Sequence, residues 1–175
     1  LLYSADRQNL QQGRTDLPNT ASDGLYGAEA ILAGGCHAAV TDLIAYWRSI
    51  HPPSGLPGRR DVDPVSIPHP LQWMWLLDVE SEPRLRFRFR LVSAKNTIVA
   101  GQELTHHYLD DVATGFEATG TYAALRGVVD SGTPHWRRGR SEMPHIEEFL
   151  HLERVALPLA ADGRRVDVIM GLSVF

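Results

Sequence analysis

The sequence predicts an α+β domain: one five-stranded antiparallel sheet with helices on one face, preceded by an N-terminal helix. The first observation is the run Arg84–Leu91, in which arginines alternate with apolar residues. Successive side chains of a strand point to opposite faces, so this run predicts a strand with one buried and one solvated face. The second observation is the order of predicted elements, which is a helix, two strands, short helices and three strands. Hairpin-joined strands that flank helices are typical of such a sheet.

Composition and charge bound the function. The 175 residues are enough for one domain with appendages, and the 43% hydrophobic and 22% charged content is ordinary for a globular protein. The net charge of −4 predicts no general attraction to nucleic acid or to anionic membranes. The only cysteine, Cys36, excludes an internal disulfide and a cysteine-based zinc site. Without a signal peptide or a long apolar run, we expect a cytoplasmic protein.

The N-terminal part divides into three regions. Residues 1–27 are polar and predict a flexible arm, and residues 28–51 predict an amphipathic helix that ends before Pro52-Pro53. Residues 52–70 form a proline-rich connector, and residues 71–175 form the sheet domain. The helix carries an apolar stripe at intervals of three and four residues, made by Val40, Leu43, Ile44, Trp47 and Ile50. This stripe either packs on its own domain or forms the interface of a homodimer.

Within the sheet domain, alternation and turn signals predict each element in order. The predicted strands cover Gln72–Val79, Arg84–Ala94, His135–Glu142, Phe149–Leu159 and residues 166–174. Acidic Asp78, Glu80 and Glu82 lie near the arginine-bearing strand, so cross-strand charge pairs are expected. Short helical turns fill residues 95–114, and a helix covers Phe116–Asp130 with Gly132 as its stop.

Three segments carry a resemblance to a known family. They are LPGRRDVDPVSIP from Leu56, RFRLVSAKNTIVAGQELTHHYLDD from Arg88, and LPLAADGRRVDVIMGL from Leu157. These motifs resemble a family of stand-alone bacterial PAS domains that is common in alphaproteobacteria. The chain departs from that pattern at Ser93-Ala94, where the family has Gly-Thr, and at His106, where it has glycine. The resemblance implies a cytoplasmic sensory or protein-interaction module, often dimeric, with an internal cavity and no catalytic activity.

The expected cavity lies between the sheet and the helices and would take a small apolar ligand, although the same side chains are also consistent with a solid core. Its expected lining residues are Phe87, Phe89, Leu91, Tyr108, Leu109, Tyr122, Leu125, Val168 and Met170. The predicted function is non-enzymatic sensing or association in bacterial signalling. The expected partner is a second copy of the chain, in a homodimer, or an unidentified signalling protein. A ligand-free dimeric scaffold is a further alternative.

An enzyme is the alternative from another class. His106, His107, Asp110 and Asp111 would be its acid–base groups, because residues four apart on a helix are neighbours. A closed zinc site needs four ligands, and the sequence offers no obvious second pair of ligands beside one of these His–Asp pairs, so no metal site is predicted. Residues 95–131 contain no cysteine for a flavin adduct and the long helix contains no histidine for haem, which argues against both cofactors, and the cofactor stays unknown. The basic groups at residues 84–90 and 136–140 predict a solvated face rather than a nucleic-acid site.

Overall fold

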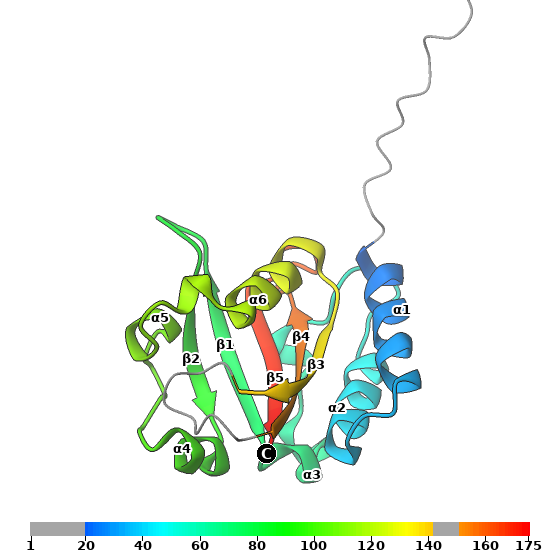
Figure 1. Cartoon of the computed structure of the whole chain (residues 1–175). Helices are drawn as coiled ribbons and strands as arrows, with labels where there is room; N and C mark the ends of the chain where they lie inside the picture. The colour runs from blue at the N-terminus through cyan, green and yellow to red at the C-terminus, as the bar shows by residue number, and fades with distance from the viewer. Residues whose placement is uncertain (1–19, 142–150) are drawn as a thin grey trace, which may run out of the picture.

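The computed structural model describes residues 20–141 and 151–175. The strands form a five-stranded sheet in the order β2-β1-β5-β4-β3, and neighbouring strands are antiparallel (Figure 1). They are β1 (Met74–Glu80), β2 (Arg86–Val92), β3 (His135–Arg140), β4 (His151–Leu159) and β5 (Val168–Val174). The predicted five-stranded α+β fold is confirmed. Residues 142 and 149–150 of the predicted strands lie outside the described residues.

A β-bulge interrupts β2. Leu77 of β1 pairs with Phe89, whereas the preceding Leu76 pairs with Leu91, so Arg90 is an extra residue on β2. Before the bulge the predicted alternation holds, and Phe87 and Phe89 are buried. After the bulge the phase reverses, and Leu91 is 43% exposed. The prediction that Leu91 shares the buried face with Phe87 and Phe89 is therefore wrong.

The segment between β2 and β3 supplies the helices on one face of the sheet (Figure 1). They are α4 (Ala94–Ala100), α5 (Leu109–Val112), the 3₁₀ turn η3 (Phe116–Ala118) and α6 (Gly120–Ser131). Ser93 caps α4 by accepting from the Asn96 amide, and Thr119 caps α6 by accepting from the Tyr122 amide. Gly132 ends α6 with a φ of 65°, which confirms the predicted stop.

The N-terminal helices α1 (Thr20–Ala33) and α2 (Ala38–Ser49) pack beside the sheet away from the α4–α6 face. The boundary expected between residues 27 and 28 falls inside α1. The indole nitrogen of Trp47 on α2 donates to the carbonyl of Pro158 on β4 at 3.0 Å. The side chains proposed as a dimer interface, Val40, Leu43, Ile44 and Trp47, are each 0% exposed within this one chain. They pack in the chain's own core, so the dimer-interface alternative is corrected: these residues are not a surface for a second copy.

The connector is part of the packed structure. It contains η1 (Arg59–Asp61), η2 (Pro64–Ser66) and α3 (Pro68–Leu71). Backbone hydrogen bonds from Leu56 to Gly163 and from Ala160 to Pro57 tie it to the turn between β4 and β5. Asp61 accepts from the Gly58 amide at 2.8 Å, and Asp63 accepts from the Val65 amide at 3.0 Å. The acidic residues of this motif therefore stabilise turns.

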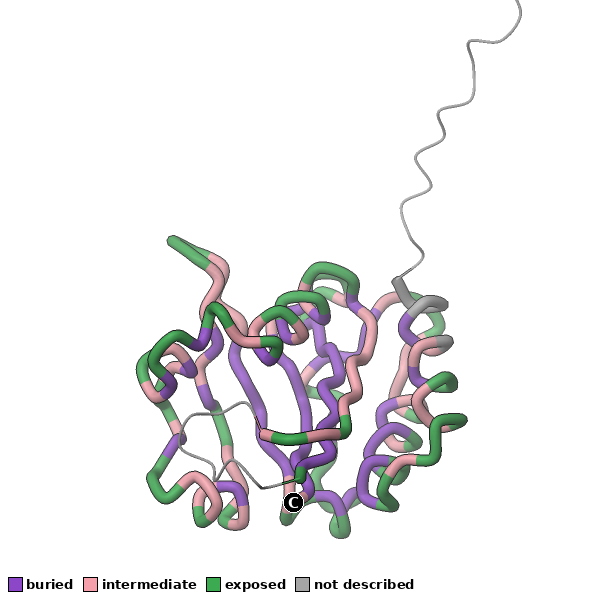
Figure 2. Tube along the Cα trace, in the orientation of Figure 1, coloured by how far each residue is buried: buried purple, intermediate pink, exposed green. Residues whose placement is uncertain are grey.

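The pattern of burial follows from the packing of α4–α6 on one face of the sheet and of α1 and α2 away from that face. The central strands β1, β5 and β4 are buried along most of their length, with exposed residues gathered at helix surfaces and turns (Figure 2). On β5 the burial covers both faces, because every residue from Val168 to Val174 is buried. Within residues 20–141 and 151–175, no helix combines the length and apolar character needed to cross a membrane.

Candidate ligand-binding cavity

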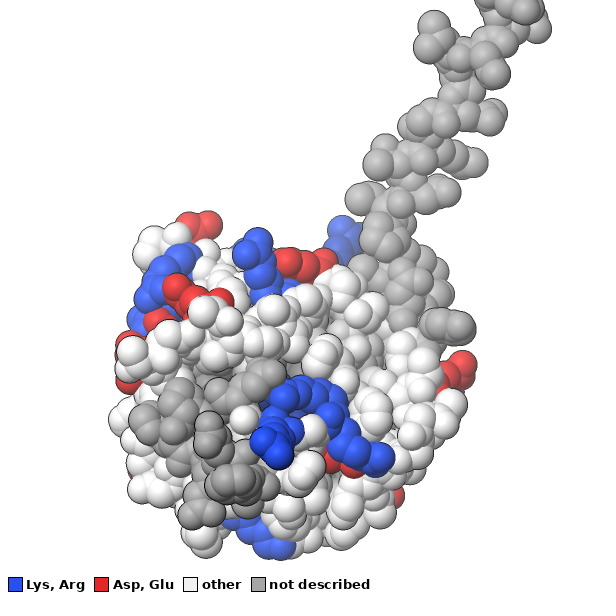
Figure 3. Space-filling view, viewed as in Figure 1, with Lys and Arg blue, Asp and Glu red and all other residues white. Residues whose placement is uncertain are grey.

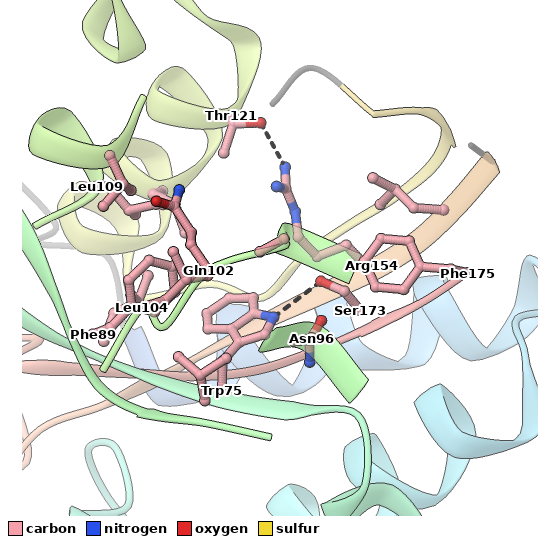
Figure 4. Close-up of a pocket in the computed structure, with 16 residues that line it drawn as sticks. Trp75, Phe89, Asn96, Gln102, Leu104, Leu109, Thr121, Arg154, Ser173 and Phe175 are labelled. Carbon is pink, nitrogen blue, oxygen red and sulfur yellow. Dashed lines mark hydrogen bonds between the residues drawn. The ribbon is translucent and has the colours of Figure 1, made fainter. Parts of the chain in front are cut away.

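A cavity of about 90 Å³ lies between the sheet and helices α4–α6 (Figure 4). The sheet provides one wall and the helices with their connecting loop provide the other. Its lining residues are Trp75, Leu77, Phe89, Val92, Asn96, Ala100, Gln102, Leu104, Leu109, Val112, Thr121, Leu125, Leu152, Arg154, Ser173 and Phe175. Three of the expected lining residues, Phe89, Leu109 and Leu125, are among them.

Three expected lining residues, Phe87, Tyr108 and Tyr122, do not line the cavity. Phe87 and Tyr122 form an aromatic cluster with Phe116, in which each pair of rings meets edge to face at 5.6–6.4 Å between centroids. Tyr108 is half-buried; its hydroxyl donates to Glu80 at 2.9 Å and its ring lies 3.7 Å below the Arg86 guanidinium. This cluster and Tyr108 therefore support the helices, and the cavity lies farther along the sheet.

Val168 and Met170 lie on the other face of the sheet. Met170 pairs with Leu76 and Leu157, whereas the cavity residue Trp75 pairs with Gly171. The expected alternation along β5 is present, but the residues that share the cavity face are Ile169, Gly171 and Ser173. The placement of Val168 and Met170 in the pocket is corrected for this reason. Because β5 is buried on both faces, hydrophobicity does not identify the face that meets the helices.

The polar lining residues were missed by sequence reasoning. Arg154 of β4 is 8% exposed, and its Nη2 donates to Oγ1 of Thr121 on α6 at 3.1 Å. Ser173 of β5 accepts from the indole nitrogen of Trp75 at 3.0 Å. The side-chain amide of Asn96 donates to the carbonyl of Trp73 at 2.7 Å and to Ser93 Oγ at 2.9 Å. The cavity thus combines mostly apolar side chains with a few hydrogen-bonding groups (Figure 4).

Trp75 lies flat across the backbone of β5. A Cβ atom placed on Gly171 would lie 2.3 Å from the indole Cη2 and 2.5 Å from the carbonyl oxygen of Val155. Real Cβ atoms do not approach other atoms so closely, so glycine at this strand position is what allows the indole to lie there. The floor of the cavity therefore depends on the absence of a side chain at Gly171.

The arginine row of β2 is neutralised by carboxylates. Asp78 of β1 bridges Arg88, at 3.1 Å, and Arg90, at 2.5 Å, and Glu80 lies 3.4 Å from Arg88. The expected cross-strand charge pairs are confirmed for these two carboxylates. Asp110 at the start of α5 accepts a hydrogen bond from Arg86 Nε at 2.9 Å. Burial alone would raise the pKa of Asp110, but the hydrogen bonds and charges of the neighbouring arginines outweigh it and lower that pKa.

Glu153 makes a second buried charge cluster on the far side of β4. Its carboxylate accepts from the backbone amide of His37 at 2.6 Å, from Trp136 Nε1 at 3.0 Å and from Arg138 at 2.8 Å. Burial would raise its pKa, but these donors together lower it below the ordinary value. Basic side chains gather over β3 (Figure 3), and Glu153 neutralises Arg138 among them. This cluster joins the start of α2 to β3 and β4.

A family model described as PAS domain matches residues 36–174. The chain belongs to the PAS domain family. The match begins before α2 and ends at the last residue of β5, so it includes α2 and the connector as well as the sheet domain expected at residues 71–175. PAS domains are generally sensory signalling modules without enzymatic activity, and they commonly mediate protein association.

Solved structures similar to this PAS domain include three with low sequence identity. A LOV protein of Rhodobacter sphaeroides is 16% identical with a TM-score of 0.45, and the match covers 58% of this chain and 57% of that one. A domain of an HTR-like protein from Haloarcula marismortui is 14% identical with a TM-score of 0.40, covering 57% and 94%. A fungal LOV domain photoreceptor is 14% identical with a TM-score of 0.43, covering 88% and 98%. Among curated proteins the search gave no match.

The acid–base cluster expected around this PAS domain's α5 does not form. His106 and His107 precede α5, which begins at Leu109, and both are exposed. His106 has a φ of 70°, outside the helical region. Asp110 and Asp111 both bind Arg86. The four residues therefore do not share a helix face, and the hypothesis of an enzyme that uses them is corrected.

The PAS cavity does not fit the cofactors weighed from the sequence. Its volume of about 90 Å³ is well below the several hundred Å³ typical of cofactor pockets. The single cysteine, Cys36, precedes α2 and is not a lining residue, so no thiol faces a flavin here. Among residues 20–141 and 151–175, no histidine lines the cavity either. Among the residues that the structure describes, no three His, Cys, Asp or Glu side chains cluster as metal ligands would.

Proposed function

We propose that this PAS domain is a regulatory module of bacterial signalling that detects a small organic molecule in the cavity between the sheet and α4–α6. The observation that carries the proposal is the cavity of about 90 Å³ itself, whose lining combines mostly apolar side chains with a few hydrogen-bonding groups. Ligand sites in proteins commonly combine an apolar lining with a few polar groups that orient the ligand.

We propose in addition that the module works in the cytoplasm, as one of the alphaproteobacterial PAS proteins whose motifs it shares. The single cysteine fits a reducing compartment. Its output would be association, either with a second copy or with a signalling protein. Because Val40, Leu43, Ile44 and Trp47 are fully buried in their own chain, such an interface would use another surface.

A thermal-shift screen of small metabolites tests the sensing role, with two variants beside the parent. Leu125→Phe enlarges a side chain in the cavity wall, whereas Ile98→Phe makes a matched change at a position on α4 that is 77% exposed. We expect ligands to raise the melting temperature of the parent and of Ile98→Phe but not of Leu125→Phe. A ligand that stabilises all three proteins equally would place the binding elsewhere, and a screen without any stabilising compound would refute the sensing role.

A further inference from the structure

Two buried polar side chains of the cavity wall are held together by one backbone carbonyl. The carbonyl oxygen of Trp73 accepts from the side-chain nitrogen of Asn96 at 2.7 Å and from the backbone amide of Ser173 at 3.1 Å. This shared acceptor places Asn96 of α4 next to Ser173 of β5. Both residues are only 8% exposed, and both line the cavity (Figure 4).

Each of these two side chains keeps one hydrogen-bonding group without a partner. Ser173 Oγ accepts from Trp75 Nε1, and among the residues that the structure describes no group accepts the hydrogen of this hydroxyl. A carbonyl oxygen only accepts, so the Asn96 atom beside Trp73 is the amide nitrogen, and the amide oxygen points the other way, toward Ser173 (Figure 4). Within residues 20–141 and 151–175 this oxygen accepts from no donor. Buried polar groups ordinarily have partners, so this donor and this acceptor indicate a ligand that satisfies both.

One donor beside one acceptor selects the polar group of the ligand. A hydroxyl group donates and accepts at a single atom, so it can donate to the Asn96 oxygen while it accepts from the Ser173 hydroxyl. A carboxylate has no hydrogen to give to the Asn96 oxygen, and an ammonium group cannot accept from Ser173. An ether accepts but does not donate. The pair therefore fits a neutral alcohol.

The other lining residues set the size and character of the rest of the molecule. Most of them are apolar, as Phe89, Leu104 and Leu125 are. A single water needs roughly 10–15 Å³ of such space, so a cavity of about 90 Å³ holds roughly six to eight non-hydrogen atoms. This corresponds to an alcohol with a short hydrocarbon body.

We propose that the cavity binds a small neutral alcohol, with its hydroxyl group between Asn96 and Ser173 and its hydrocarbon body against the apolar lining. This inference rests on the proposed sensing function, because it names the ligand class of the same cavity. Asn96 keeps its hydrogen bond to Trp73 and Ser173 keeps the one from Trp75 when the alcohol binds.

Isothermal titration of the full chain with 1-hexanol, methyl pentyl ether and hexanoate tests the requirement for a hydroxyl group. The alcohol and the ether are isomers of similar size, and only the alcohol has a hydrogen to donate. Hexanoate has the same number of carbon atoms but carries a negative charge. We expect 1-hexanol to bind at least about fivefold more tightly than either of the others, which is the factor that one net hydrogen bond typically contributes.

Three variants test the two residues. Ser173→Ala removes the donor and should weaken the binding of 1-hexanol at least about fivefold. The matched control Ser49→Ala changes an exposed serine at the end of α2 and should leave the affinity unchanged. Asn96→Leu keeps the approximate size of the side chain but removes the acceptor, so it should abolish the preference for the alcohol over the ether.

The outcomes separate this inference from the function on which it rests. Equal or tighter binding of the ether or of hexanoate would overturn the alcohol inference and leave the sensing role standing. If none of the three probes binds while other metabolites do, the ligand class is again wrong. If no compound of the wider screen binds, both proposals fail. Should Ser173→Ala or Asn96→Leu not fold, which circular dichroism would show, the comparison of the three probes on the unaltered chain still decides.

Discussion

Gly171 shows how one residue determines the shape of the cavity. Its strand position lies against the indole of Trp75, where a Cβ atom has no room. The indole then spans the β5 backbone and its nitrogen reaches Ser173. A substitution at Gly171 therefore acts on the cavity through Trp75 as well as on the stability of the sheet.

Gly171→Ala should lower the free energy of unfolding by about 1–3 kcal/mol, because the added methyl group overlaps Trp75 and the β4 backbone. Urea denaturation followed by far-UV circular dichroism measures the change. The matched control is Gly127→Ala on α6, where a Cβ atom meets nothing within 4 Å. There we expect a gain of about 1 kcal/mol from the better helix propensity of alanine. Equal stability of Gly171→Ala and the parent would contradict the packing described for Trp75.

At the residue scale, the sequence predicts the apolar part of the site better than the polar part. Phe89, Leu109 and Leu125 were predicted because apolar periodicity marks buried faces. Arg154 and Ser173 were not, because a charged residue or a serine in a strand ordinarily indicates a solvated face. The available signal was the position of Arg154 within LERVALPL, where strongly apolar neighbours indicate a strand buried on both sides.

At the scale of the element, the bulge in β2 separates two residues that the alternation placed together. Phe87 is 1% exposed and packs against Phe116 and Tyr122, whereas Leu91 beyond the bulge is 43% exposed. The extra residue at Arg90 therefore decides which of two similar apolar positions stabilises the core.

Phe87→Ala should destabilise the protein by about 3–5 kcal/mol, as expected for the loss of a buried aromatic ring. Leu91→Ala should cost less than about 1 kcal/mol, because the side chain is largely outside the core. Thermal and chemical unfolding of the two variants in parallel give the comparison. Similar losses for both variants would mean that the strand continues without a bulge.

The positions of the strands were largely predictable from the sequence. Which side chains of a strand face the cavity was not. Turn residues such as Gly132 and the alternation of β2 located the strands and α6 to within a few residues, whereas the single helix expected over residues 28–51 is divided into α1 and α2. The bulge at Arg90 has no marker in the sequence, since an inserted residue leaves the local composition unchanged. The connector was recognised as proline-rich, but the short helical turns that Asp61 and Asp63 stabilise within it were not predicted.

At the scale of the whole molecule, Glu153 connects parts of the chain that are distant in sequence. It accepts hydrogen bonds from the backbone amide of His37, just before α2, and from two side chains of β3. Its neighbour Arg154 points to the opposite side, into the cavity. Consecutive residues of β4 thus contact the N-terminal helix region and the proposed ligand site.

Glu153 should also make stability depend on pH. Its folded-state pKa lies below the ordinary value of 4.5, so its carboxylate stabilises the fold above that value and this contribution is lost as the pH falls through the folded pKa. Urea denaturation over a pH series should show unfolding free energy falling in this acidic range. Glu153→Gln should be less stable near neutral pH and should show a shallower fall. Part of the fall remains, because the pKa of Asp110 is also lowered.

The control for this pH series is Glu29→Gln, since Glu29 is exposed and bound to Arg48 at the surface. Its pH dependence should match that of the parent. An unchanged acid slope in Glu153→Gln would show that the buried carboxylate does not contribute to the linkage between protonation and folding.

The position of Trp75 has a practical consequence. The chain has four tryptophans, and this one places its ring in the cavity wall with its N–H held by Ser173. Indole emission responds to nearby water and polar groups, so a molecule that fills the space beside the ring changes the colour of the light it emits. The protein therefore carries an intrinsic optical reporter of occupancy, readable without any attached dye.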